Sequence, residues 1–189
     1  MQWTAIILCG GRGLRAGGRD KGLLPVYGRP MIQQVLESIG PRAASIVISA
    51  NRNRARYAEL GHTVVADTIA QHQGPLAGLQ AALAICDTPL VAVLPCDMPL
   101  LPADTVPRLI AGLGDAELCF ARDGERDQYL VAVMRRDIRD NLDRFLASGG
   151  RAVHRWYATL DTVTVDFSNA ADKFQQFNAP QDVDAQRRP

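Results

Sequence analysis

A short apolar run near the start of the chain is followed directly by a glycine-rich, basic loop. The run spans Ala5–Leu8, and five of the nine residues in 10–18 are glycine. Such a stretch builds neither a helix nor a core, but it lets backbone N–H groups converge on a ligand. Four cations lie in the loop or just after it: Arg12, Arg15, Arg19 and Lys21. This arrangement predicts a site for an anionic group such as a nucleotide polyphosphate.

Two common phosphate-binding motifs fit this loop less well. Residues 11–16 match the dinucleotide fingerprint G-x-G-x-x-A, but Gly17 and Gly18 interrupt the helix that should begin there. A P-loop ends in Gly-Lys-Ser/Thr, whereas Lys21 is followed by glycine and has no neighbouring hydroxyl. A mobile surface loop with solvated charges stays open as an alternative. The position of the loop after a buried strand argues against it.

Short apolar runs alternate with helical patterns along the whole chain. The expected strands are Ala5–Leu8, Ile46–Ile48, Thr63–Val65, Leu90–Leu94, Leu118–Phe120, Leu130–Met134 and Val163–Val165. The expected helices are Met31–Ile39, Arg54–Leu60, Leu79–Ile85, Thr105–Leu113 and Ile138–Ala147. Strands that alternate with helices predict crossover connections and parallel pairing. The expected fold is therefore α/β, a three-layer αβα sandwich around a Rossmann-like, mostly parallel, twisted sheet of about seven strands.

Polar residues follow each of the first four expected strands. The glycine loop follows the first, Ser49 and Asn51 the second, Asp67 the third and Asp97 the fourth. In open α/β sheets, ligands bind beyond the carboxyl ends of the strands. The sequence therefore predicts a binding site at this edge.

Three of these side chains suit a nucleotide with its metal ion. Asp97 at the end of a buried strand is a natural Mg²⁺ ligand, although a turn or cap aspartate before Pro99 is the alternative. Lys21 offers a point charge for a polyphosphate, although many lysines are merely solvated. Asp67 lies where a nucleotide base or ribose could be bound, or it is an ordinary loop aspartate.

The length and charge of the chain limit the remaining classes of function. The 189 residues predict one domain over 1–189, with 186–189 as a loose tail. A net charge of +1 predicts neither nucleic acid nor membrane as a partner. A signal peptide and a long apolar span are missing, and the cysteines form no CxxC pair. We therefore expect a cytoplasmic protein with reduced thiols.

The motifs together resemble a known family. The loop reads Gly10-Gly11-x-G-x-R-x-G-G-x-Asp20-Lys21-Gly22, with Pro25 and Gly28-Arg29-Pro30 after it. Further matching segments are Ala50-Asn51-Arg52, Asp67, Gly74-Pro75-Leu76-Ala77-Gly78, Pro95-Cys96-Asp97-Met98-Pro99, Asp123-Gly124-Glu125-Arg126 and Asn178-x-Pro180. This pattern, from Ile6 to about Val183, resembles the nucleotidyltransferase signature of molybdenum cofactor guanylyltransferases.

The resemblance implies a reaction and its participants. GMP would pass from GTP to the terminal phosphate of molybdopterin, which releases pyrophosphate and forms the guanine dinucleotide cofactor. Mg²⁺ is the implied cofactor, and GTP and molybdopterin are the implied small-molecule partners. Transient contact with proteins that deliver molybdopterin or mature molybdoenzymes is also expected.

The same reasoning assigns the site residues. The expected catalytic residues are Arg15, Lys21 and Asp97, and the expected metal ligands are Asp97 and Asn178. The expected nucleotide-binding residues are Leu8, Cys9, Gly10, Gly11, Lys21, Ser49, Asn51, Asp67 and Asp97. Three points stay open. Asn178 could be a turn residue, Ser49 replaces the asparagine common in relatives, and Gln128-Tyr129 replace a His-Pro pair that continues the 123–127 turn.

Other functions remain as alternatives. A cytidylyltransferase acting on the same pterin uses the same chemistry, as does a sugar-phosphate nucleotidyltransferase, although sugar enzymes usually need a longer chain. A nucleotide-binding regulatory module without turnover would tolerate the loss of Asp97. A dinucleotide oxidoreductase would need a helix directly after Gly13.

Overall fold

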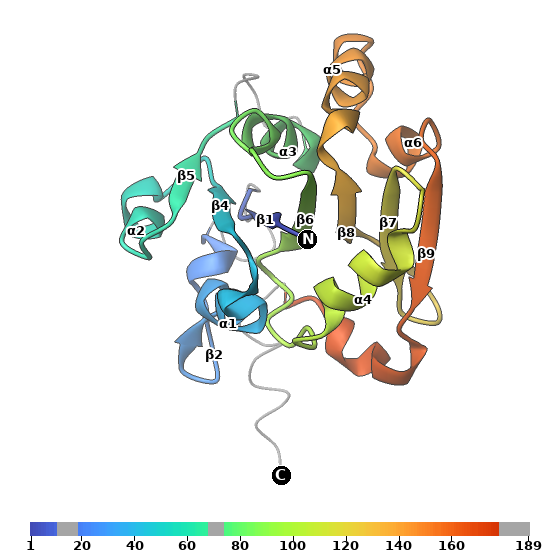
Figure 1. The fold of residues 1–189 in the computed structure, drawn as a ribbon. Helices are drawn as coiled ribbons and strands as arrows, with labels where there is room; N and C mark the ends of the chain where they lie inside the picture. The colour runs from blue at the N-terminus through green and yellow to red at the C-terminus, as the bar shows by residue number, and fades with distance from the viewer. Residues whose placement is uncertain (11–18, 68–73, 178–189) are drawn as a thin grey trace.

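One mixed β-sheet forms the centre of the protein, and helices cover both of its faces (Figure 1). The computed structural model describes residues 1–10, 19–67 and 74–177. Gly11, Arg15, Asn178 and the expected tail 186–189 lie outside these ranges. In the part of the chain that is described, seven strands form the sheet in the order β5-β4-β1-β6-β8-β7-β9. Their bounds are β1 Trp3–Leu8, β4 Ser45–Ser49, β5 Thr63–Val65, β6 Leu90–Pro95, β7 Leu118–Arg122, β8 Asp127–Arg135 and β9 Thr162–Asp166.

The strands β5, β4, β1 and β6 are parallel to one another, as the alternating pattern predicts. β8 runs antiparallel to both β6 and β7, while β9 returns parallel to β7. Only residues 123–126 connect β7 to β8, and a crossover between parallel strands needs a dozen residues or more. The short turn therefore imposes a hairpin, and the mostly parallel α/β fold is confirmed.

The first five helices of the described chain fall close to the expected positions, and a further short helix follows them. Their bounds are α1 Met31–Ile39, α2 Arg54–Ala58, α3 Pro75–Leu83, α4 Thr105–Leu113, α5 Arg139–Ala147 and α6 Val153–Tyr157. α3 begins four residues before the expected Leu79, because Pro75 has the φ of a first helical turn and Gly74 takes φ +83° before it. Short 3₁₀ turns occupy Lys21–Leu23 (η2), Gly40–Arg42 (η3), Arg136–Ile138 (η4) and Ser168–Phe174 (η5).

Two large hydrophobic clusters lie on opposite faces of the sheet and join it to the helices on each side, which gives three layers. Along β1 the side chains alternate, with Ala5 and Ile7 in one cluster and Ile6 and Leu8 in the other. α1 and α4 contribute to the first cluster, whereas α3, α5 and α6 contribute to the second. Figure 1 shows α3 and α5 on the opposite side of the sheet from α1 and α4. Both faces of β1 are buried, which explains its continuous apolar sequence.

A third, smaller hydrophobic cluster packs a short hairpin against the end of the described chain. The sequence did not predict this hairpin. The hairpin consists of β2 Pro25–Val26 and β3 Arg29–Pro30. Val26 packs there with Met31 and Phe177. Within the described ranges, none of the helices has the length and apolar character needed to cross a bilayer.

Candidate functional site

Backbone hydrogen bonds hold the ends of β1, β4, β5 and β6 together at one edge of the sheet. Cys9 N–H donates to Ser49 O at 2.8 Å, and Cys96 N–H donates to Leu8 O at 3.1 Å. Ala50 N–H donates to Val65 O at 2.8 Å. Parallel pairing therefore continues past the strands, and the loops that carry the predicted site residues leave from neighbouring points.

Lys21 and Asp97 lie side by side at this edge. Lys21 Nζ is 3.4 Å from Asp97 Oδ2, and the two side chains are 26% and 16% exposed. Burial raises the pKa of Asp97, and the nearby Lys21 ammonium opposes this rise only in part. The carboxylate is thus held in a desolvated position where a further cation would be stabilising.

The main chain of Asp97 connects this pair to the far end of the protein. Phe177 N–H donates to Asp97 O at 2.9 Å, and Phe177 itself is buried. The next residue in the sequence is Asn178, the second expected metal ligand, which lies outside the described residues. Among the residues that are described, no three His, Cys, Asp or Glu side chains gather as a metal site.

Asn51 and Asp67 form a doubly hydrogen-bonded pair beside the ends of β4 and β5. Asn51 Nδ2 donates to Asp67 Oδ2 at 2.8 Å, and Asp67 N–H donates to Asn51 Oδ1 at 2.9 Å. Both residues are partly exposed. The amide therefore fixes the orientation of a carboxylate that solvent, or a ligand, can reach.

Ser49 lies beneath this pair rather than beside it. The residue is 2% exposed, and a Cβ on Gly78 of α3 would stand 2.3 Å from its Oγ. The same Cβ would stand 3.2 Å from Asp67 Oδ1. Gly78 therefore lets α3 pack directly against both side chains, a role that the sequence analysis did not assign to it. The spacing Gly74–Gly78, at the start of an apolar helix, was the available signal.

Two buried thiols lie directly behind the edge. Cys9 and Cys96 follow the paired strands β1 and β6 and are free. Contact with the Cys9 thiol and burial both raise the pKa of Cys96 well above its usual range. A protonated, buried thiol is a poor nucleophile.

A second connection reaches the edge from the segment after β4. Tyr57 Oη donates to Asp20 Oδ1 at 2.6 Å, and Asn53 Nδ2 donates to Asp20 Oδ2 at 3.0 Å. Arg52 donates to Arg19 O at 3.3 Å. These contacts hold the residues that directly precede Lys21, and no motif in the sequence indicated them.

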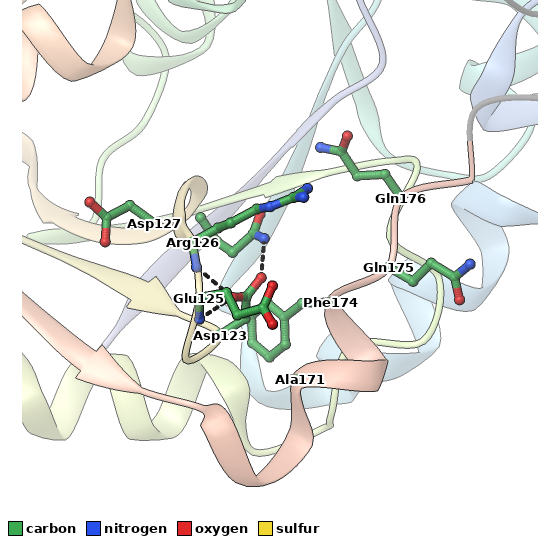
Figure 2. A pocket seen from close by; sticks show the side chains of 9 residues that line it. Asp123, Glu125, Arg126, Asp127, Ala171, Phe174, Gln175 and Gln176 are labelled. Atoms are coloured by element: carbon green, nitrogen blue, oxygen red, sulfur yellow. Dashed lines mark hydrogen bonds between the residues drawn. The ribbon is translucent and has the colours of Figure 1, made fainter.

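A hollow of about 620 Å³ opens between the β7–β8 hairpin and the segment that leads to Phe177 (Figure 2). The hairpin supplies Asp123, Glu125, Arg126, Asp127 and Gln128, and the other wall consists of Ala171, Phe174, Gln175 and Gln176. Figure 2 shows Gln175 and Gln176 across the hollow from the hairpin tip. Because Phe177 bonds to Asp97, this wall runs from the hollow to the Lys21–Asp97 pair.

Asp123 shapes the hairpin tip. Its Oδ1 accepts the N–H groups of Glu125 and Arg126 at 3.0 and 2.7 Å, and its Oδ2 accepts Gln128 Nε2 at 2.6 Å. Burial raises the pKa of Asp123, but these hydrogen bonds outweigh it and lower the pKa overall. Gln128 therefore stabilises the turn.

Comparison with known proteins identifies the family. Residues 5–163 match the family described as MobA-like NTP transferase domain. A molybdenum cofactor guanylyltransferase of Shewanella sediminis is 40% identical over 183 residues, which are 96% of this chain and 93% of that protein. One from Shewanella pealeana is 42% identical over 182 residues, covering 95% of this chain and 91% of that protein.

Solved structures share the fold at lower identity. Molybdopterin-guanine dinucleotide biosynthesis protein A from Archaeoglobus fulgidus has a TM-score of 0.77 at 21% identity, covering 96% of this chain and 95% of that one. A 4-diphosphocytidyl-2C-methyl-D-erythritol synthase from Anaerococcus prevotii has a TM-score of 0.73 at 12% identity, with 97% and 95% covered.

Gly78→Ala tests the packing beneath the Asn51–Asp67 pair. The added methyl group would displace Ser49 and Asp67, so we expect the free energy of unfolding to fall by about 1–3 kcal/mol. We also expect weaker GTP binding in calorimetric titration. Gly112→Ala in α4 is the matched control, since its Cβ would stand 2.3 Å from Val165 Cγ2, on β9. It should lose stability but keep its GTP affinity. Equal GTP affinities in the two variants would contradict a role for Gly78 in the site.

Proposed function

The chain belongs to the MobA-like NTP transferase domain family, and we propose that it acts as a molybdenum cofactor guanylyltransferase. It would transfer GMP from GTP to the terminal phosphate of molybdopterin and release pyrophosphate. One observation carries the proposal. Lys21, Asp97 and the Asn51–Asp67 pair meet at one sheet edge in a chain about 40% identical to guanylyltransferases over nearly its whole length.

The phosphate end of GTP would bind at Lys21 and the glycine loop. The ammonium group already faces a carboxylate across 3.4 Å, so a triphosphate that approaches with a cation replaces one ion pair by two. Gly10 is exposed and an added Cβ there meets nothing within 4 Å, which leaves room beside its backbone. The backbone N–H groups of Gly10 and Gly11 and the guanidinium of Arg15 are our further candidates for phosphate contacts, whereas Leu8 and Cys9 would border the nucleotide, since Cys9 N–H already donates to Ser49 O.

Mg²⁺ suits the chemistry of Asp97. This ion binds proteins through one or two carboxylates and completes its shell with phosphate oxygens and water, so a cluster of three acids is not needed. Asp97 is a desolvated carboxylate with its charge incompletely balanced. We propose Asp97 and Asn178 as the ligands. When bound, the ion would neutralise the charge that develops on the transferred and departing phosphates.

The guanine base would be read by the Asn51–Asp67 pair. A carboxylate whose orientation is fixed can accept guanine N1–H and N2–H₂ together, and Asn51 fixes Asp67 through two hydrogen bonds. Ser49 is nearly inaccessible, so we assign it the support of Asp67 through α3 rather than a side-chain contact with the nucleotide.

The reaction requires the protein to position the substrates and to neutralise their charge. A phosphate oxygen of molybdopterin attacks the α-phosphorus, a new P–O bond forms, and the bond to the β-phosphate breaks as pyrophosphate leaves with the electron pair. The attacking phosphate is already ionised, so no side chain has to remove a proton. Positioning and charge neutralisation supply the catalysis. The hollow beside Gln175 and Gln176 is our proposed site for the pterin, because its wall leads to Asp97. Contacts with delivery and maturation proteins and a cytoplasmic location stay predictions.

Asp97→Asn should separate catalysis from stability. Loss of the charge should slow transfer by at least about 10²-fold. The folded protein holds the Asp97 proton more tightly than the unfolded chain does, so stability falls as pH rises above the ordinary carboxyl pKa of about 4. Without metal ions at pH 7, the variant should therefore melt at a higher temperature than wild type, with the difference closing toward pH 4.

Dinucleotide formation and scanning calorimetry from pH 4 to pH 8 measure the two effects. A near wild-type rate at saturating Mg²⁺ would refute the catalytic assignment. A lower melting temperature at pH 7 would mean that attraction to Lys21 outweighs the burial of Asp97.

Competition among nucleotides tests the base and the reaction together. With equal GTP, CTP and ATP and molybdopterin as acceptor, we expect the guanine dinucleotide as the main product. Asp67→Asn should reduce the preference for GTP by about tenfold or more, because only guanine loses paired hydrogen bonds. Preferential cytidine transfer would identify a cytidylyltransferase, and binding without turnover would identify a regulatory module. An unchanged preference in Asp67→Asn would assign base recognition to the backbone near Leu8–Gly10.

A further inference from the structure

Asp20 is held from both of its carboxylate oxygens by a single short helix. Asn53 and Tyr57 are four residues apart, so they lie on the same side of the first turn of α2. Tyr57 Oη reaches Oδ1 at 2.6 Å and Asn53 Nδ2 reaches Oδ2 at 3.0 Å. Asn53 takes φ +48° and makes no capping hydrogen bond to its own helix, so its side chain serves Asp20 instead.

The hydroxyl of Tyr57 is built into the core. The residue is 0% exposed, yet its Oη keeps a short hydrogen bond to a carboxylate that is partly exposed. Burial, followed by the neighbouring Cys9 and Cys96 thiols and Asp20, raises its pKa far above the usual value for tyrosine. The hydroxyl therefore stays protonated at neutral pH and donates its hydrogen bond to Asp20.

The chain crosses directly over this hydroxyl just after Asp20. A Cβ on Gly22 would stand 2.6 Å from Tyr57 Oη and 3.3 Å from Cys96 Sγ, so only glycine allows this approach. Lys21 therefore lies between Asp20, which is held by hydrogen bonds, and Gly22, which is held by close packing. Its Nζ lies 3.4 Å from Asp97 Oδ2.

We propose that Tyr57, assisted by Asn53, is a positioning residue that holds Asp20 and Gly22 so that Lys21 is presented to the triphosphate. This inference rests on the proposed function and deepens it. Tyr57 has no contact with the nucleotide in this scheme and acts through Lys21.

The same short segment also connects the two halves of the nucleotide site. Asn51 bonds to Asp67 at the proposed base position, and Asn53 and Tyr57 bond to Asp20 at the proposed phosphate position. Residues 51–57 therefore set the separation between base and triphosphate recognition. A ligand must supply both groups at this separation, which favours a nucleoside triphosphate over a free base or free pyrophosphate.

Tyr57→Phe removes the hydroxyl and keeps the ring. We expect the Kd for GTP with Mg²⁺ to rise about tenfold and the transfer rate to fall by a similar factor, with the KM for molybdopterin unchanged. Tyr157→Phe is the matched control, since this buried tyrosine also donates through its hydroxyl, to Tyr129 O at 2.7 Å, but on the opposite face of the sheet. It should lower the melting temperature and leave the Kd for GTP unchanged.

A double-mutant cycle shows whether Tyr57 acts through Lys21. Added to Lys21→Ala, Tyr57→Phe should change the Kd for GTP less than twofold, whereas additive effects would overturn the proposed route.

Asn53→Gly provides a second test, because glycine tolerates the positive φ of this position. We expect a two- to threefold rise in the Kd for GTP at an unchanged melting temperature. If Tyr57→Phe does not fold, Asn53→Gly decides alone, and an unchanged Kd would overturn the proposal. Wild-type protein that fails to bind GTP would overturn the proposed function itself. Wild-type binding with an equal Kd in Tyr57→Phe would overturn only the positioning role.

Discussion

Parallel pairing of β4, β1 and β6 is the constraint on which the rest of the site depends. Parallel strands end at the same edge, so the residues that follow them are brought together although they are far apart in sequence. Backbone hydrogen bonds from Cys9, Ala50 and Cys96 extend this pairing past the strands. Hydrogen-bonded backbone at the strand ends therefore forms the base of the site, and the loops that leave it supply the charged groups. Because this base is fixed, the packing and hydrogen bonds of the loop residues decide where each charge lies.

The edge is also a place where stability and function oppose each other. Asp97 is desolvated and its pKa is raised, so its charge costs folding free energy that Lys21 offsets only in part. The same incomplete compensation makes it a good partner for a metal ion. The residues around Asp97 are each held by several contacts. Gly22 and Gly78 allow close packing against Tyr57 and Ser49, and Asp20 and Asp67 are each held by hydrogen bonds from residues 51–57.

The sequence predicted the strands and most helices because their patterns are local. The run Ala5–Leu8 and the alternation along the chain require only that apolar residues be buried. The clustering of the polar strand ends was also predictable, because parallel strands place Asp67 and Asp97 at the same edge of the sheet. The bond between Tyr57 and Asp20 was not, because it joins residues 37 apart through a buried side chain. The burial of Ser49 beneath Gly78 likewise depends on how α3 packs on β4. The hollow beside Gln175 arises from two segments distant in sequence.

The central claim is that this edge holds the whole nucleotide, with guanine at Asn51 and Asp67 and the phosphates at Lys21 and Asp97. A crystal structure with GTP and Mn²⁺ in place of Mg²⁺ tests it most directly, because manganese gives an anomalous signal that locates the ion. We expect the signal about 2.1 Å from a carboxylate oxygen of Asp97, with the guanine edge within hydrogen-bonding distance of Asp67. Manganese bound away from Asp97, or a base bound away from the Asn51–Asp67 pair, would contradict the account.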